Sequence, residues 1–128
     1  SVCSPEAQSE IKVRLLSPVV AYSTFLKPEG GKYTCYFQPG EQEFNRLAEE
    51  NLRKKYQAFY NQEPPAGDVR IKCLKSPRLH LIKYKSFVIK GYSGLLLLQG
   101  PQLLLQIALD AGLGSKNSMG FGLLEMMN

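Results

Sequence analysis

Residues 41–60 restrict the fold more than any other segment, because their apolar side chains recur every three or four residues. This spacing predicts a long helix with one apolar face, which the rest of the chain has to cover. Glu41 and Glu43 at its start and Lys54 and Lys55 in its last third suit the helix dipole. The apolar positions are Phe44, Leu47, Ala48, Leu52, Tyr56 and Phe59.

Strand patterns precede and follow this helix. Residues 19–25 and 33–37 are β-prone and flank a turn, which predicts a hairpin or a bent edge strand, and a second strand pair is expected at residues 80–90. A second helix is expected to begin at Gly100-Pro101 and to end at Gly112 in the left-handed conformation. Four further segments with the spacing or length of strands are 11–16, 69–73, 93–98 and 121–127.

The segments therefore follow the order strand, helix, strand, strand, helix, strand. That order is typical of an α+β ferredoxin-like fold (βαββαβ), in which a four-stranded antiparallel sheet carries two helices on one face. We expect this fold with an inserted β-hairpin that contains Lys83 and Lys85, and with the second face of the sheet left open. The fold by itself does not identify a function.

The length of the chain limits the number of domains. With 128 residues it is long enough for one core and too short for two, so we expect one domain over residues 1–128. The longest apolar stretch, residues 95–109, contains Gln99 and Pro101, which argues against a membrane span and for a soluble protein. Because the first residue is Ser and no signal sequence follows, we expect the chain to begin inside a longer parent or after processing.

Positive charge is concentrated in the second half of the chain. The net charge is +5, and residues 69–90 contain seven cations and no carboxylate. Such a cluster is expected on a surface that binds a polyanion, although a solvated basic face has the same composition. The seven cations are Arg70, Lys72, Lys75, Arg78, Lys83, Lys85 and Lys90.

Cysteine and histidine are too few and too scattered for a structural metal or disulfide framework. The chain has three cysteines, none in a C-x-x-C pair, and one histidine, His80. We therefore expect no metal site, no cofactor and no disulfide, and a reducing cytoplasm as the location.

The most distinctive motif is a glycine-rich segment, residues 112–122, here called the glycine loop. Its spacing fits neither a Rossmann nor a Walker loop. The loop follows a helix rather than preceding one, so anion binding would have to use its own amides and side chains. A helix cap with a tight turn explains the first two glycines but not the last two. We expect anion contacts from Gly112, Gly114, Ser115, Lys116, Asn117, Ser118, Gly120 and Gly122.

This glycine spacing resembles the glycine-rich loop near the C-terminus of the RAMP superfamily of CRISPR-associated proteins. More narrowly, residues 89–94, 100–101 and 112–125 together resemble the CRISPR repeat-RNA processing endoribonucleases, and residues 17–19 and 51–56 fit the start of that family's C-terminal half. The resemblance spans most of the chain. It implies that the chain is the second of two ferredoxin-like domains in a tandem.

The resemblance also implies an activity for the parent protein. Members of this family cut precursor CRISPR RNA within each repeat without a metal, and the attack of a ribose 2′-oxygen leaves a 2′,3′-cyclic phosphate. Their catalytic histidine lies in the N-terminal domain, so we expect no catalytic residue in this chain and no cutting by it alone. The implied partners are repeat RNA, the N-terminal domain, and a second copy or an effector complex, in a prokaryotic cytoplasm. RNA contacts are expected from the glycine loop and from Arg70, Lys72, Arg78, Lys83 and Lys85.

Two other functions stay open: a RAMP subunit that holds guide RNA without cutting it, and a small-molecule regulatory domain. His80 is expected to be an edge-strand or packed histidine rather than a catalytic group. Tyr84 and Tyr92 could stack on bases, whereas Phe121 and residues 95–98 are expected to lie in the core.

Overall fold

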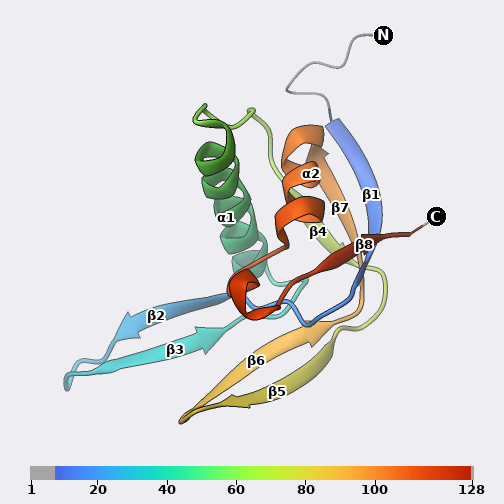
Figure 1. Ribbon diagram of the computed structural model, residues 1–128. Coiled ribbons are helices and arrows are strands. Elements are labelled where there is room, and N and C mark those ends of the chain that lie inside the picture. Colours follow the sequence, from blue (N-terminus) through green and yellow to red (C-terminus); the bar gives the residue numbers. More distant parts are fainter. Residues whose placement is uncertain (1–7, 128) are drawn as a thin grey trace, which may run out of the picture.

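The computed structural model describes residues 8–127, whose centre is a four-stranded antiparallel sheet (Figure 1). The strand order in the sheet is β4-β7-β1-β8, so the first and third strands of the fold lie in the middle. The four strands are β1 (Gln8–Leu15), β4 (Arg70–Cys73), β7 (Leu95–Pro101) and β8 (Leu124–Met126).

Two helices cover one face of this sheet. α1 (Gln42–Tyr60) contacts β4 and α2, and α2 (Gln102–Ala111) contacts β1, β7 and β8. The apolar stripe of α1 is buried as its spacing predicts at Phe44 and Leu52, both inaccessible to solvent. Phe59 was expected in the same stripe but is 66% exposed, because the last turn of α1 extends beyond the core. The expected ferredoxin-like fold is therefore confirmed, including an open second sheet face. No helix in residues 8–127 is long and apolar enough to span a membrane.

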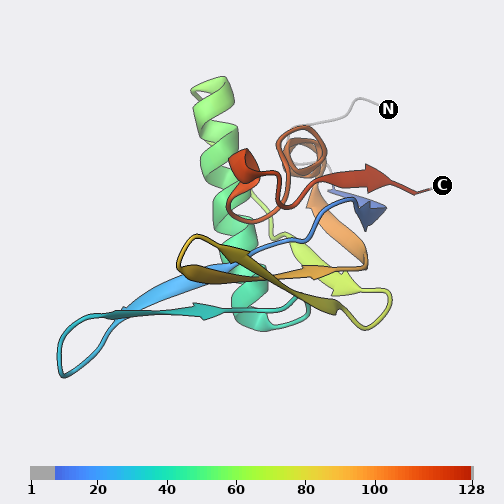
Figure 2. The same cartoon turned by 60° about the horizontal axis from the view of Figure 1, so that its bottom comes forward.

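Two β-hairpins extend from the same end of the domain (Figures 1 and 2). The first pairs β2 (Tyr22–Leu26) with β3 (Lys32–Tyr36), and the second pairs β5 (Arg78–Tyr84) with β6 (Phe87–Ser93). Both predicted strand pairs are confirmed, the first as a hairpin rather than a bent edge strand. They lie outside the four-stranded sheet, so each leaves much of its side-chain surface for other contacts.

The short edge strand β4 is held against α1 by side chains of the helix. Asn45 donates from Nδ2 to the Val69 carbonyl at 2.6 Å and accepts from the Ile71 amide at 2.7 Å. Glu49 accepts from the Val69 amide at 2.6 Å. These bonds satisfy backbone groups that an edge strand leaves without a sheet partner.

Two expectations about β7 and α2 need correction. Pro101 is not the first helical residue, because its ψ of 129° is extended and it ends β7 before α2 begins at Gln102. The apolar run in β7 is not uniformly core either. Leu96 and Leu98 face the helices and are buried, whereas Leu95 and Leu97 are half-buried on the open face, since side chains alternate along a strand.

Candidate nucleic-acid interface

The glycine loop is attached to the rest of the domain by main-chain hydrogen bonds. The Leu113 amide donates to the Gly122 carbonyl at 2.8 Å, which closes the loop on itself. The Ser115 amide donates to the Val20 carbonyl at 2.7 Å, which ties the loop to the segment before β2. The amides of Gly112, Ser115, Gly120 and Gly122 bind carbonyls of the protein itself, so the expected nest of free amides does not include these four residues.

Three of the four glycines are required by this packing. A Cβ at Gly122 would lie 2.0 Å from the Leu113 carbonyl oxygen of the loop itself, and a Cβ at Gly114 would lie 2.4 Å from the Val20 carbonyl oxygen. Gly112 has φ 96° and ψ 165°, which is a region open essentially to glycine but is not the expected left-handed helical conformation. Gly122 therefore has a structural explanation that the sequence did not suggest. Gly120 differs, because it is exposed and a Cβ there meets nothing within 4 Å.

Asn117 closes the loop from inside. Its Nδ2 donates to the Leu113 carbonyl at 3.1 Å and to the Phe121 carbonyl at 2.9 Å, so both amide protons are directed into the protein. Lys116 is half-buried, and Ser118 lies on the surface. We call residues 115–120 the exposed arc of the glycine loop, since the residues accessible from outside lie there.

Lys55 of α1 holds the first part of the loop. Its Nζ donates to the Gly112 carbonyl at 2.9 Å and to the Gly114 carbonyl at 3.2 Å. Burial lowers the pKa of the Lys55 amine to about 8. From the sequence this lysine was expected only to suit the helix dipole, and its contact with the loop was not predicted. The available signal was its position three residues after Leu52, on the edge of the buried stripe of α1.

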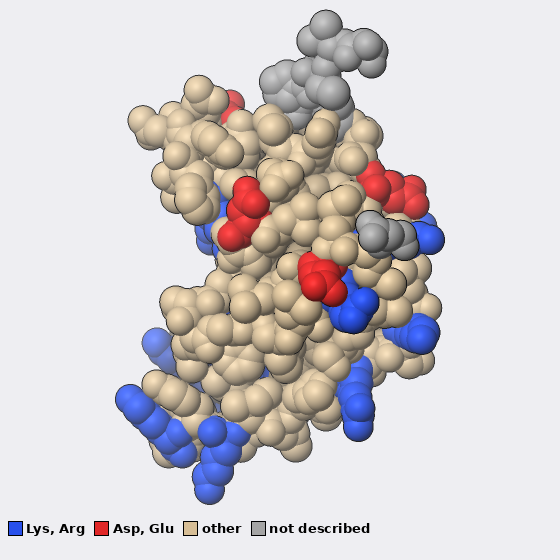
Figure 3. Space-filling view, turned by 45° about the vertical axis from the view of Figure 1, so that its right-hand side comes forward, with Lys and Arg blue, Asp and Glu red and all other residues tan. Residues whose placement is uncertain are grey.

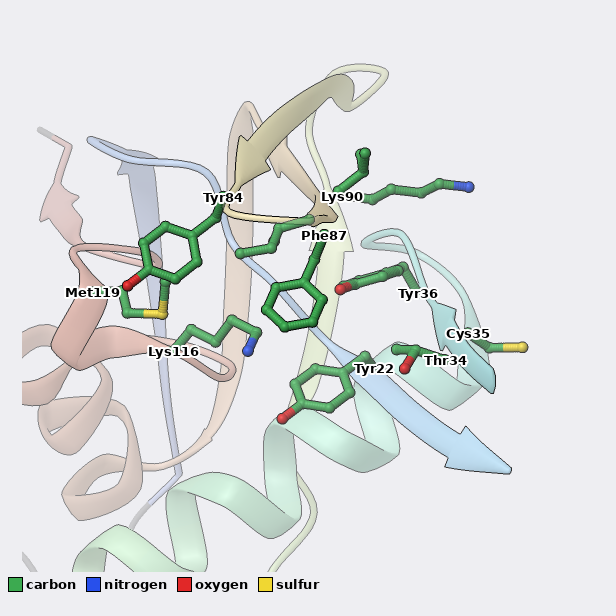
Figure 4. Close-up of a pocket in the computed structure, with 11 residues that line it drawn as sticks. Tyr22, Thr34, Cys35, Tyr36, Tyr84, Phe87, Lys90, Lys116 and Met119 are labelled. Atoms are coloured by element: carbon green, nitrogen blue, oxygen red, sulfur yellow. The ribbon is translucent and has the colours of Figure 1, made fainter. Parts of the chain in front are cut away.

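The exposed arc borders a pocket of about 670 Å³ between the two hairpins (Figure 4). The rings of Tyr22 and Phe87 and the amine of Lys116 point into the same space. Lys116 Nζ lies 5.0 Å from the centre of the Tyr22 ring, a cation–π distance. Tyr36 and Met119 add to the lining, and none of the described residues that line the pocket is Asp or Glu.

The predicted cations do not form one continuous strip. Arg70 and Lys72 lie on β4 and face the open side of the sheet, whereas Arg78 and Lys83 lie on β5 and Lys85 lies in the hairpin turn. The tertiary structure also supplies the acids that the segment lacks in sequence, because the depression lined by Arg70 contains Glu41, Glu43, Glu49 and Asp68.

Positive charge nevertheless gathers at the end of the domain from which the hairpins project. In Figure 3, the lysine and arginine side chains dominate the lower part of the visible face, and acidic side chains lie above them. Lys85 Nζ lies 5.4 Å from the centre of the Tyr84 ring, and Lys90 and Lys116 contribute to the pocket lining. The glycine loop and the second hairpin therefore each contribute one lysine, Lys116 and Lys90, to the lining of the pocket.

The remaining residues singled out in the sequence have different environments. A ring nitrogen of His80 lies 2.7 Å from Ser93 Oγ across the second hairpin, which fits the expected packed histidine. Phe121 is 8% exposed and lies in the core as expected, and Tyr92 packs against the main core, where burial raises its pKa. Tyr84 lines the pocket. Among residues 8–127, no cluster of three or more His, Cys, Asp or Glu could hold a metal ion.

Comparison with protein families gives a match over nearly the whole chain. Residues 3–126 match the family described as "CRISPR associated protein Cas6, C-terminal". The chain is 29% identical over 117 residues to CRISPR-associated endoribonuclease Cas6 1 of Methanocaldococcus jannaschii, and 29% identical over 94 residues to CRISPR-associated endoribonuclease Cas6 of Pyrococcus furiosus. These alignments cover 87% and 69% of the chain but 43% and 33% of the relatives, so the chain spans less than half their length.

In solved structures with the same fold, this chain likewise covers only about half of the matched chain's length. A "CRISPR associated protein Cas6" superposes with a TM-score of 0.78 at 25% identity, over 98% of this chain and 52% of that one. The structure described as "Characterization of a Cas6-related gene from Pyrococcus furiosus" gives 0.83 at 19% identity, over 99% and 51%. The second likeness shows the fold alone.

Gly120, which is exposed, and Gly122, which is buried, give a matched pair of variants that tests the packing role of the loop glycines. Gly120→Ala and Gly122→Ala both place a side chain at positive φ (92° and 76°), but only the latter brings a Cβ within 2.0 Å of a carbonyl oxygen. We expect Gly122→Ala to lower the free energy of unfolding in urea by about 1–3 kcal/mol more than Gly120→Ala. Equal losses would contradict the structural role given to Gly122.

The half-buried amine of Lys55, whose pKa is lowered to about 8, predicts a pH dependence of stability. Between pH 8 and the ordinary lysine pKa of 10.5, the unfolded chain binds more protons at this position than the folded chain, so stability contributed by Lys55 rises with pH. The neutral amine keeps two N–H donors for its two carbonyls. The unfolding free energy of the wild type should therefore increase relative to that of Lys55→Met from pH 8 to pH 10. The exposed neighbour Lys54→Met is the control, and parallel curves for the wild type and Lys55→Met would refute the prediction.

Proposed function

The chain belongs to the C-terminal family of CRISPR-associated Cas6 proteins, and we propose that it is the RNA-binding C-terminal domain of a two-domain endoribonuclease that processes precursor CRISPR RNA. The observation that carries this proposal is the family match over residues 3–126. The names of the two endoribonuclease relatives support the activity. The fraction of their length that the chain spans leaves room for a second domain. The free Cys35 and Cys73 suit the proposed cytoplasmic location.

The exposed arc of the glycine loop is the proposed phosphate-binding element. Lys116 supplies a charge, and the hydroxyl groups of Ser115 and Ser118 supply donors beside it. Because internal hydrogen bonds already hold the loop, RNA does not have to order it on binding, which reduces the entropic cost of association. The cations proposed to extend the phosphate contacts beyond the loop are Lys72, Arg78, Lys83 and Lys85.

The cleavage chemistry is proposed to depend on the other domain. Attack of a 2′-oxygen on the adjacent phosphate needs a base, an acid and groups that stabilise the added negative charge, and each proton transfer contributes roughly 10²–10⁴-fold. His80 is engaged with Ser93 inside a hairpin and is not assigned a catalytic role. In this proposal the chain binds and orients the RNA, and it does not cut RNA alone.

Removal of the Lys116 charge tests the phosphate contact. We expect Lys116→Gln to weaken binding of repeat RNA and of scrambled RNA by similar factors, because a phosphate contact does not read sequence. The log-log slope of affinity against salt should become shallower by about 0.7 for single-stranded RNA. Fluorescence anisotropy at several salt concentrations measures both effects, with the exposed Lys54→Gln of α1 as the control. An unchanged slope would remove Lys116 from the interface.

Cleavage by the full-length parent distinguishes the proposed enzyme from its alternatives. Given repeat RNA in EDTA, the parent should produce one cut per repeat and a 2′,3′-cyclic phosphate end, detected by its resistance to ligation until the ring is opened and the phosphate is removed. A parent that binds the RNA and leaves it intact would be a guide-holding RAMP subunit. Negligible RNA affinity that is indifferent to salt would favour a small-molecule regulatory domain.

A further inference from the structure

The pocket between the hairpins contains aromatic side chains that the fold does not need. Phe87 is 59% exposed and Tyr84 is 43% exposed, although both lie beside a hollow of about 670 Å³. An aromatic side chain of the core has a different exposure, since Phe44 is fully buried. Exposed aromatic groups around a concave surface of this size are typical of a ligand site.

The chemistry of the lining favours a base attached to a phosphate. The flat faces of Phe87 and Tyr22 match the face of a heterocycle, and Lys116 reaches the same space from the exposed arc (Figure 4). The hydroxyl groups of Thr34 and Tyr36 provide polar partners for the edge of a base. Burial raises the pKa of Tyr36, so its phenol stays protonated and can donate. No described lining residue carries a negative charge that would repel a phosphate.

The position of the pocket favours a base that is not stacked in an RNA duplex. Its walls come from β2 and β3 on one side, from the second hairpin on the other, and from Lys116 and Met119 of the glycine loop. A base in a duplex has both faces covered by its neighbours, so it cannot offer a face to side chains within such walls. An unpaired or extruded base can place its face against these side chains.

From this arrangement we propose that the pocket binds one unpaired nucleobase of the bound RNA, stacked on Phe87 and Tyr22, with an adjacent phosphate at Lys116. The inference rests on the proposed function, because it requires RNA on the exposed arc. It adds a base-binding subsite to a surface that otherwise contacts only phosphates.

The test compares two phenylalanines of similar exposure. Phe87 lines the pocket, whereas Phe59 is 66% exposed near the end of α1, away from the pocket-lining residues. We expect Phe87→Ala to weaken binding of a short single-stranded RNA by about tenfold, as the loss of one stacked base does, and Phe59→Ala to leave it unchanged. Affinity for a blunt RNA duplex, and the salt slope for either RNA, should be the same in both variants. Both side chains are exposed, so both variants should keep the thermal midpoint of the wild type.

A spectroscopic measurement reports stacking directly. The chain contains no Trp, so the emission of a single 2-aminopurine in the single-stranded RNA is free of protein background. With the base analogue moved through successive positions, at least one position should be quenched by the wild type and by Phe59→Ala but not by Phe87→Ala. The same oligonucleotide in a duplex should show no added quenching.

The outcomes separate this inference from the proposed function. If Lys116→Gln weakens RNA binding while Phe87→Ala behaves like Phe59→Ala, the surface binds RNA and the base pocket is wrong. If Phe87→Ala weakens single-stranded and duplex RNA equally, the ring supports the surface and does not stack on a base. If the wild type binds no RNA, both proposals fail.

Discussion

The contact on which the arrangement depends lies where residues 18–20 meet the glycine loop and the second hairpin. The main-chain groups of Val19 and Tyr92 bond in both directions at 2.8 Å and 2.9 Å. The Val20 carbonyl accepts from Ser115, and the Pro18 carbonyl accepts from the Gly122 amide at 2.8 Å. A segment of three residues with two isolated β-bridges thus joins β6 to the loop, and β2 begins two residues after it, at Tyr22. The position of each wall of the pocket follows from this junction.

Glycine allows the close approach that this junction needs. Added side-chain carbons at Gly114 and Gly91 would lie 2.4 Å from the Val20 carbonyl and 2.8 Å from a Pro18 carbon. Backbones packed at this distance leave little freedom for the loop to move relative to the hairpins. The bonds from Lys55 act from the other side and connect the same loop to α1. The loop is therefore held rigidly against the hairpins and α1. Lys116, with a backbone φ of 62°, extends from it toward the Tyr22 ring.

The candidate site could be predicted from the sequence in part. The glycine spacing identified the loop, and the basic segment identified a cationic hairpin, because both are properties of neighbouring residues. The aromatic partners of Lys116 were not predicted. Tyr22 and Phe87 lie in strands that alternate in an ordinary way, and nothing local distinguishes a ring that faces a pocket from one that faces solvent or core. Arg70 was grouped with the other cations, since three of the four acidic residues around it lie in α1 or just before it, and only Asp68 is near it in sequence.

Local spacing by itself determined the helix at residues 42–60, the two hairpins and the order of elements that makes the fold ferredoxin-like, because periodicity and turn residues act over short distances along the chain. The glycine motif likewise identified the family. Only the tertiary structure decided which glycines are needed for close packing and which one has open space around it. It also decided that Lys55 binds the loop and that the two hairpins enclose one aromatic pocket. These features depend on contacts between segments far apart in sequence, whose distances no spacing along the chain encodes.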